Sequence, residues 1–348
     1  MKINLKHLAV LVLTVVSSAM LAGATGISYT CDASISTSVC TTLNTTIAGQ
    51  YSSLFSDANA SIYITFGNTG LGSSTQYLNF VSYNTYLTAL TANSSGDAID
   101  TASLASLPAT EPGIYSGGQV EVTSALGDAL GFGAGAGTTS SIGYCNNPGS
   151  SGCYDGVITL ATPSIVAGYG QGYYYGSGPQ PTNDYNLYTI VEHETNEILG
   201  TSSCISTQGA GLTDYCGGSS PSAVDLFRYQ APGTRVLENT TPGAYFSYDG
   251  GATNGANGAT YNTLVNGNDY ADFAQNCQHV QDAQGCPGST QYVTTDGGAE
   301  VNILDAVGYN QNQQGPSPTP EPSSLSLFAT GLGGIAALIR RRQHKLTA

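Results

Sequence analysis

The sequence predicts a mixed α+β fold for the central part of the chain, on the evidence of two strand-like and two helix-like segments. Residues 61–66 alternate in polarity and predict a strand, as do residues 155–161. Residues from about 38 to 55 and from about 83 to 91 are expected to be helical. Because segments of both kinds alternate along the chain, an α+β fold is favoured.

Two Gly-rich stretches interrupt this pattern, at residues 131–137 and 168–178, and the second contains Tyr173, Tyr174 and Tyr175. They are expected to be surface loops or a tyrosine platform for a glycan or peptide.

The first 24 residues have the features of a secretory signal peptide. Lys2 and Lys6 precede an apolar stretch at residues 8–20, and Ala22-Gly23-Ala24 forms a small-residue cleavage site. The apolar stretch is shorter than the roughly 20 residues that a membrane span needs. We therefore expect secretion across the inner membrane and a mature chain that begins near Thr25.

The charge of the body excludes nucleic acid as its main partner. Between residues 25 and 314, only Arg228 and Arg235 are basic, against 22 of the 23 carboxylates, which gives a formal charge of −20. Such a polyanion has no electrostatic attraction to phosphate backbones.

All eight cysteines lie in the body and form four close pairs along the sequence. An even number of cysteines in an exported chain predicts disulfides, and no C-x-x-C spacing suggests a zinc site instead. Because each cysteine has one near neighbour, we expect the following bonds: Cys31–Cys40, Cys145–Cys153, Cys204–Cys216 and Cys277–Cys286.

The chain ends in a tail, residues 315–348, of different composition. Its features are, in order, Pro320-Glu321-Pro322, an apolar run at 325–339, and Arg340, Arg341 and Arg342. This order resembles the PEP-CTERM sorting signal of Gram-negative bacteria. The resemblance implies processing by an exosortase-type enzyme, transient membrane contact through the hydrophobic helix, and delivery to the cell surface or exopolysaccharide matrix. A simple C-terminal anchor is the alternative.

The chemistry of the body centres on a predicted helix at residues 187–199, which ends at Gly200. His193 and Glu197 lie one turn apart on the same face, so that both can bind one metal ion, while Glu194 can reach a water beside it. This is the arrangement of the H-E-x-x-H zinc helix with Glu as the second ligand, and zinc accepts carboxylate oxygen. The alternative is a surface helix with clustered acids.

Neighbouring segments extend this pattern. Gly200 stands where metzincin-type zincins turn away from the active helix, whereas Ser203 replaces their usual third histidine. Further segments follow at residues 222–233, 245–251, 267–273, 280–283 and 303–309. Together these residues resemble a family of secreted bacterial zinc metalloproteases, many of which carry PEP-CTERM tails. The resemblance implies a zincin-like catalytic domain over residues 25–314, with subdomains 25–186 and 201–310 flanking the helix.

The resemblance also implies roles for individual residues. His193 and Glu197 bind Zn²⁺, and Glu194 is the general base that deprotonates the attacking water. The third ligand is open: Asp225 is the first candidate, His279 the second and Asp305 the third. A weaker signal for Ca²⁺ comes from three acidic residues, Asp269, Asp272 and Asp282.

These observations lead to a main functional hypothesis and two alternatives. The main hypothesis is a secreted zinc-dependent endopeptidase that acts on peptides or proteins. The first alternative is a non-catalytic surface, exopolysaccharide-matrix or adhesion protein on a degenerate zincin fold. Glycan binding or hydrolysis is the second, although the sequence places no carboxylate pair at catalytic distance.

Overall fold

The computed structural model describes residues 26–110, 118–133, 135–205, 216, 220–238, 240–263, 269–274 and 276–312. The expected signal peptide and sorting tail lie outside these residues. Contacts within the chain group the described residues up to Gln311 into one compact unit, the first of two. Among the described residues, no helix has the length and apolar character that a membrane crossing requires.

Helices and strands alternate along the first unit, as the sequence predicts. The strands are β1 (Ile27–Cys31), β2 (Ala60–Gly67), β3 (Gly72–Gln76), β4 (Leu78–Ser82), β5 (Gln119–Thr123), β6 (Ala136–Thr138), β7 (Tyr144–Asn146), β8 (Gly156–Ala161), β9 (Gly172–Tyr174), β10 (Asp184–Asn186), β11 (Arg228–Ala231), β12 (Thr234–Arg235) and β13 (Tyr245–Phe246). The α-helices are α1 (Thr37–Thr42), α2 (Ala48–Leu54), α3 (Tyr83–Asn93), α4 (Ala98–Ser106), α5 (Ser124–Ala129), α6 (Pro163–Gly168), α7 (Leu187–Asn196) and α8 (Ala299–Val307). Two π-helical turns, η1 (Leu43–Ile47) and η2 (Glu197–Thr201), and a 3₁₀ turn, η3 (Val224–Phe227), complete the set.

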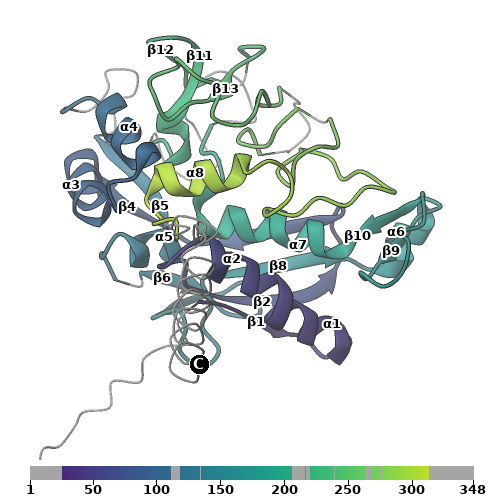
Figure 1. Cartoon of the computed structure of the whole chain (residues 1–348). Helices are drawn as coiled ribbons and strands as arrows, with labels where there is room; N and C mark the ends of the chain where they lie inside the picture. Colours follow the sequence, from purple (N-terminus) through teal and green to yellow (C-terminus); the bar gives the residue numbers. More distant parts are fainter. Residues whose placement is uncertain are drawn as a thin grey trace, which may run out of the picture. The chain divides into compact units, whose positions relative to one another are not determined.

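A four-stranded sheet in the order β1-β2-β8-β3 lies at the centre of this unit (Figure 1). β1, β2 and β8 are parallel, whereas β3 runs antiparallel to β8 at the edge. Within β2, the fully buried Ile62 and Ile64 alternate with partly exposed neighbours. The strands predicted at residues 61–66 and 155–161 are thus confirmed.

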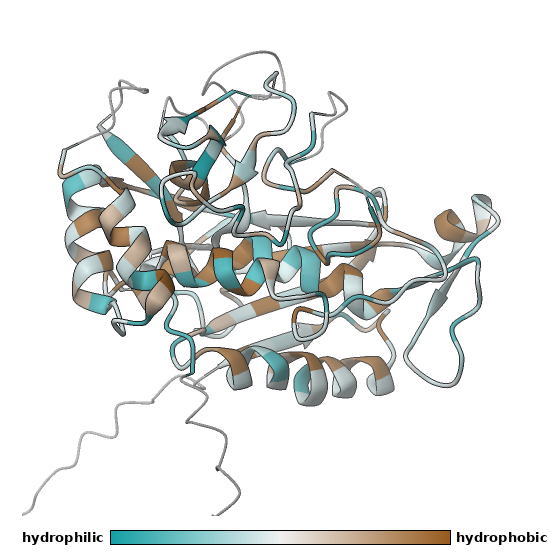
Figure 2. Cartoon of the chain, turned by 45° about the horizontal axis from the view of Figure 1, so that its top comes forward, coloured by the Kyte–Doolittle hydropathy of each residue, from teal (hydrophilic) through white to brown (hydrophobic). Residues whose placement is uncertain are grey.

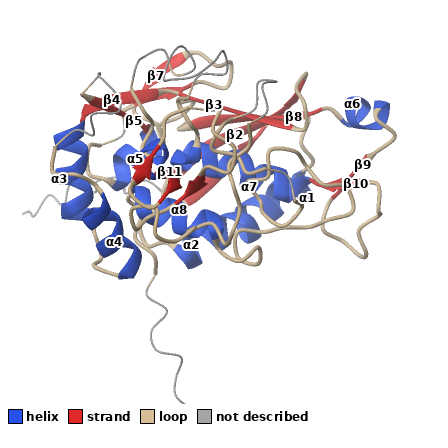
Figure 3. Ribbon diagram, turned by 90° about the horizontal axis from the view of Figure 1, so that it is seen from above, coloured by secondary structure: helices blue, strands red, loops and turns tan. Residues whose placement is uncertain are grey.

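Helices cover one side of this sheet (Figure 3). α1, η1 and α2 form one continuous helical segment, whose buried residues Val39, Leu43, Ile47 and Tyr51 recur every four positions. That spacing places them on one face of the helix, which packs against β1 and α7. Figure 2 shows the resulting alternation of hydrophobic and hydrophilic residues along the helices. The predicted helices at 38–55 and 83–91 are confirmed.

A close approach between helix and sheet sets the position of α7 and η2. Gly156 of β8 faces Ile198, and a Cβ atom at Gly156 would lie 2.5 Å from that side chain. The missing side chain therefore allows the helical segment that carries the H-E-x-x-E motif to lie directly on the sheet. On its other side, η2 contacts α8, which also packs against α4.

The cysteines form the four predicted disulfides: Cys31–Cys40, Cys145–Cys153, Cys204–Cys216 and Cys277–Cys286. Each closes a short loop, as the local pairing in the sequence indicates. Disulfides of this number are typical of proteins in an oxidising, extracellular environment.

The Tyr-rich stretch differs from the expected platform at one position. Tyr173 is buried in strand β9, where its hydroxyl donates to the carbonyl of Ala161 over 3.0 Å and its ring contacts Phe66. This tyrosine belongs to the core, whereas Tyr175 is exposed.

Candidate metal centre

The motif helix begins and ends at well-defined caps. Asn186 accepts hydrogen bonds from the backbone N–H groups of Tyr188 and Thr189 on its side-chain oxygen, which caps the start of α7. After Asn196 the helix widens into η2, and it ends near Gly200, whose φ of 123° is a left-handed value that favours glycine. The predicted helix and its terminating glycine are confirmed.

His193 points its outer nitrogen at two carboxylates. Its Nδ1 lies 3.0 Å from the carbonyl oxygen of Val280, which can only accept, so Nδ1 carries the proton of this hydrogen bond. Nε2 lies 3.6 Å from Glu197 Oε1 and 3.5 Å from Asp272 Oδ1. Since Nδ1 donates to a fixed backbone group, the ring orientation is set before any ion binds.

The spacing of these three atoms suits one tetrahedral ion. Ligands placed about 2.1 Å from a tetrahedral centre lie about 3.4 Å from one another. The ligand atoms of His193, Glu197 and Asp272 all lie within 4.8 Å of each other. The distances from His193 Nε2 to Glu197 Oε1 and to Asp272 Oδ1 are close to this ligand–ligand distance. The three residues could therefore hold a metal ion with little rearrangement.

Asp272 is positioned by a chain of hydrogen bonds that extends to Tyr51 in α2. Gln281 Nε2 donates to Asp272 Oδ1 over 3.0 Å, and Gln281 Oε1 accepts from Asn196 Nδ2 over 3.3 Å. The hydroxyl of Tyr51 in turn donates to Asn196 Oδ1 over 2.7 Å. All four side chains are buried, so this relay fixes the third carboxylate relative to α7.

Strand β3 supplies contacts to both glutamates of the motif. Ser74 Oγ donates to Glu197 Oε2 over 2.5 Å, which leaves Oε1 directed at His193. Gly72 lies directly against Glu194. A Cβ atom at position 72 would lie 2.4 Å from Glu194 Oε1 and 2.7 Å from Ile190 Cγ2. The edge strand thus lies directly over the motif helix.

The motif residues open into a cavity of about 480 Å³. His193, Glu194, Glu197 and Asp272 line it together, so the glutamate between the two helix ligands shares the cavity with the candidate metal site. The rest of the lining comes from Gly70–Ser74, Tyr185, Thr189, Ile190, Asp269, His279, Val280, Asp282–Cys286 and Gln291.

The electrostatic environment around His193 favours a bound cation. Burial alone would lower the pKa of His193, but Asp272 and the hydrogen bond with Glu197 raise it well above its ordinary value. Burial raises the pKa of Asp272 to about 7, although His193 acts in the opposite direction. Burial, followed by the charge of Glu197, raises the pKa of Glu194 well above its ordinary value. Several buried carboxylates around one imidazole are an environment that a cation stabilises.

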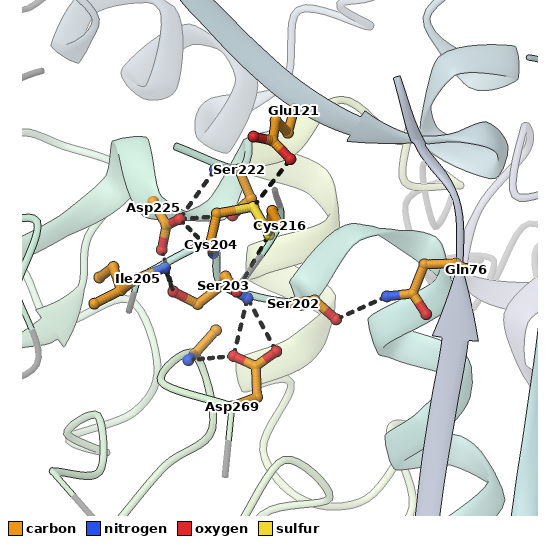
Figure 4. Close-up of a disulfide and its surroundings, with 11 residues drawn as sticks. Gln76, Glu121, Ser202, Ser203, Cys204, Ile205, Cys216, Ser222, Asp225 and Asp269 are labelled. Carbon is orange, nitrogen blue, oxygen red and sulfur yellow. Dashed lines mark hydrogen bonds between the residues drawn. A yellow bond between two sulfur atoms is a disulfide. The ribbon is translucent and has the colours of Figure 1, made fainter. Parts of the chain in front are cut away.

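Asp225, the first candidate for the third ligand, lies in a different cluster (Figure 4). Its Oδ1 accepts from Ser203 Oγ over 2.6 Å, and its Oδ2 accepts from the backbone N–H groups of Cys204 and Ser222 and from Ser222 Oγ. With its oxygens occupied in this way, Asp225 links residues 203–204, which follow the motif helix, to Ser222. The structure brings Asp272, and not Asp225, to His193 and Glu197.

The other two candidates also lie in separate groups. His279 lies with Asp296 and Glu300, and Asp305 lies with Asp97 and Asp100. A further group among the described residues, Glu121 with Cys204 and Cys216, offers no thiolate, because its cysteines form a disulfide.

The three acidic residues considered for Ca²⁺ have three different roles. Asp269 accepts from the backbone N–H groups of Ser203 and Ala271, and Asp282 accepts from the backbone of Gln278 and His279. Only Asp272 joins the group around His193. The sequence singled out Asp272 as an acidic residue but gave no reason to connect it with the motif helix.

Comparisons with known proteins find no protein family that matches the chain, and no significantly similar curated protein or solved structure.

Proposed function

We propose that the chain is a secreted zinc-dependent endopeptidase whose metal ion is held by His193, Glu197 and Asp272. The observation that carries this proposal is the convergence of these three side chains in a cavity that also contains Glu194. One imidazole and two carboxylates leave a position open in a four-coordinate ion, as in catalytic zinc sites. When bound there, zinc lowers the pKa of water and polarises a carbonyl group.

The remaining chemistry belongs to Glu194. It lies between the two helix ligands and reaches the same cavity while it is itself almost completely buried. A carboxylate in this position accepts the proton of the attacking water on one of its oxygens and then donates it to the leaving amine. Gly72 permits this placement, since any larger residue there would occupy the space of the Glu194 side chain.

The edge strand supports a peptide as the substrate. Within the described residues, β3 pairs only with β8 in the central sheet, and Gly72, Ser73 and Ser74 line the cavity. An extended peptide can add to such an edge through main-chain hydrogen bonds. This addition would carry the peptide along the cavity and past Glu194.

Other parts of the chain support a location outside the cytoplasm. The disulfides are consistent with an extracellular environment. The N-terminal signal and the PEP-CTERM-like tail support secretion and sorting to the cell surface or matrix.

The test compares metal content and peptidase activity in the full secreted chain and three variants. We expect about one zinc ion per wild-type chain and none in His193→Ala, because the variant lacks the imidazole ligand. Glu194→Gln should keep the metal but lose activity on an unfolded protein substrate by about 10²–10⁴-fold. Glu192→Gln is the matched control, since Glu192 is buried on the same helix and accepts from the backbone of Val293 instead.

The outcomes separate the zinc endopeptidase from the non-catalytic surface protein. Zinc in the wild type without any activity that depends on Glu194 would support the non-catalytic surface protein. Absence of zinc from all four proteins, with disulfides formed and metal supplied, would overturn the proposal.

A further inference from the structure

A second cluster of carboxylates lies where α4 meets α8. Asp97 caps the start of α4, Asp100 lies in its first turn, and Asp305 comes from α8. One oxygen from each of the three lies within 4.8 Å of the others. None of these residues lines the cavity around His193, so the cluster is separate from the site described above.

Short loop contacts fix two of the carboxylates. Asp97 Oδ1 accepts from the backbone N–H groups of Ile99 and Asp100, each over 2.9 Å. Asp100 Oδ2 accepts from Ser95 Oγ over 2.9 Å and from the backbone N–H of Gly96 over 3.1 Å. Both side chains are therefore held in place by the start of the helix itself.

The third carboxylate has an oxygen that these contacts do not satisfy. Asp305 is 0% exposed, and its Oδ2 accepts from Gln311 Nε2 over 2.7 Å. Its Oδ1 is buried, and no N–H or hydroxyl group of the described residues donates to it. A buried carboxylate oxygen without a partner is costly, and such groups in proteins normally pair with a donor or a metal ion.

Mutual repulsion adds to this cost. Burial, and then the charges of Asp97 and Asp100, raise the pKa of Asp305 to about 8, and a hydrogen bond with Asp97 acts in the same direction. Three carboxylates from two helices thus approach one another closely in the interior. Without an ion, a proton on Asp305 relieves their repulsion, and a cation among them would replace that proton.

We propose that Asp97, Asp100 and Asp305 form a structural Ca²⁺ site that joins α4 to α8. The donor set consists of oxygen alone, which suits a hard cation, and Ca²⁺ accepts six to eight oxygens in flexible geometry. The three carboxylates supply part of this shell, and water or backbone carbonyls complete it.

The position of the site connects it with the cavity around His193. Glu300, on the first turn of α8, accepts from the backbone N–H of Gln281, whose side chain donates to Asp272. A calcium ion that fixes α8 against α4 would therefore also fix the segment that positions Asp272. This proposal does not depend on zinc binding or on peptidase activity.

The test measures thermal unfolding and Ca²⁺ binding of the full secreted chain. Calcium at about 100 times its Kd should raise the Tm of the wild type by about 5 °C relative to EGTA. Isothermal titration with CaCl₂ should show one site, both in the wild type and in His193→Ala. Asp305→Asn and Asp100→Asn should lose the binding and the Tm shift.

The matched control is Glu300→Gln, which changes another buried acid on the same helix and should retain the calcium response. In EGTA, Asp305→Asn should have a Tm at least equal to that of the wild type, because the amide keeps the shape and can donate to Asp97 as the protonated carboxyl group does. A purely structural Asp305 would instead make this variant less stable in both conditions, which would overturn the proposal. No Ca²⁺ binding by the wild type, or equal binding by wild type, Asp305→Asn and Asp100→Asn, would overturn it as well.

Discussion

Asp225 and Asp272 are both buried aspartates that follow the motif helix in sequence, but their surroundings differ. Asp225 accepts four hydrogen bonds, from two serine hydroxyls and two backbone N–H groups. Asp272 accepts one from Gln281 on the oxygen that faces His193 Nε2. A carboxylate whose two oxygens accept four hydrogen bonds from neighbouring loops holds the fold together, whereas one that keeps an oxygen directed at an imidazole can bind a metal ion.

Ser203, which stands where the sequence resemblance expects a third histidine, has a structural role. Ser203 uses its backbone N–H to bind Asp269 and its hydroxyl to bind Asp225 (Figure 4). Ser203 is thus a link between two loops. In the proposed metal site, the third ligand is Asp272, three residues after Asp269.

The largest expected effect comes from exchanging the carboxyl group of each aspartate for an amide. Asp272→Asn should weaken zinc binding by at least about 100-fold, because changes in the outer shell alone cost 10–100-fold. Asp225→Asn should leave zinc affinity unchanged and lower the free energy of unfolding by about 2–4 kcal/mol, since the amide turns a donor toward a backbone N–H. Zinc titration and denaturant unfolding of the two variants measure both effects.

The same two variants also test whether Asp272, rather than Asp225, is the metal ligand. If Asp225→Asn lost zinc while Asp272→Asn kept it, the ligand assignment from geometry would be reversed. If both kept zinc, the metal would bind elsewhere in the chain.

A smaller effect is expected from a methyl group added to the edge strand above Glu194. In Gly72→Ala the new Cβ would overlap Glu194 and Ile190, so the variant should lose about 1–3 kcal/mol of stability. Displacement of Glu194 by about 1 Å should lower kcat by about 100-fold, with zinc content unchanged. Gly70→Ala is the control, because Gly70 also lines the cavity but has open space around its Cβ position. Equal activity in the two variants would contradict the role assigned to Gly72.

Local patterns were sufficient to predict much of the fold. The strands β2 and β8, the helices at residues 38–55 and 83–91, the motif helix and all four disulfides depend on neighbours in sequence or on regular spacing, and the structure confirms them. The pairing of β1, β2, β8 and β3 into one sheet was not predicted. It depends on main-chain pairing between segments that are distant in sequence, such as β2 with β8, which no periodicity reveals.

The candidate third ligand, Asp272, shows why the site was predicted only in part. His193, Glu194 and Glu197 share one helix, so helical geometry alone places them together. Asp272 reaches them through a loop held by Gln281 and the buried Tyr51–Asn196 pair, which are tertiary contacts. In a body with 22 carboxylates, acidic residue type alone could not distinguish Asp272 from Asp225 or Asp305.

The smallest effect concerns the pH dependence of the cluster around Asp225. Glu121 lies beside it and is buried, with Oε1 unpaired and Oε2 3.5 Å from Cys204 Sγ. Burial, and then the charge of Asp225, raise the pKa of Glu121 to about 8. Because an unfolded chain releases this proton near pH 4.5, the folded state binds more protons between about pH 4.5 and 8. The contribution of Glu121 to stability therefore falls as the pH rises through that range.

Glu121→Gln removes this contribution, so the stability of the variant relative to the wild type should increase steadily from pH 5 to 8 in denaturant unfolding. A constant difference across that range would mean that Glu121 is already ionised in the folded protein at pH 5 and that its pKa is not raised by burial beside Asp225.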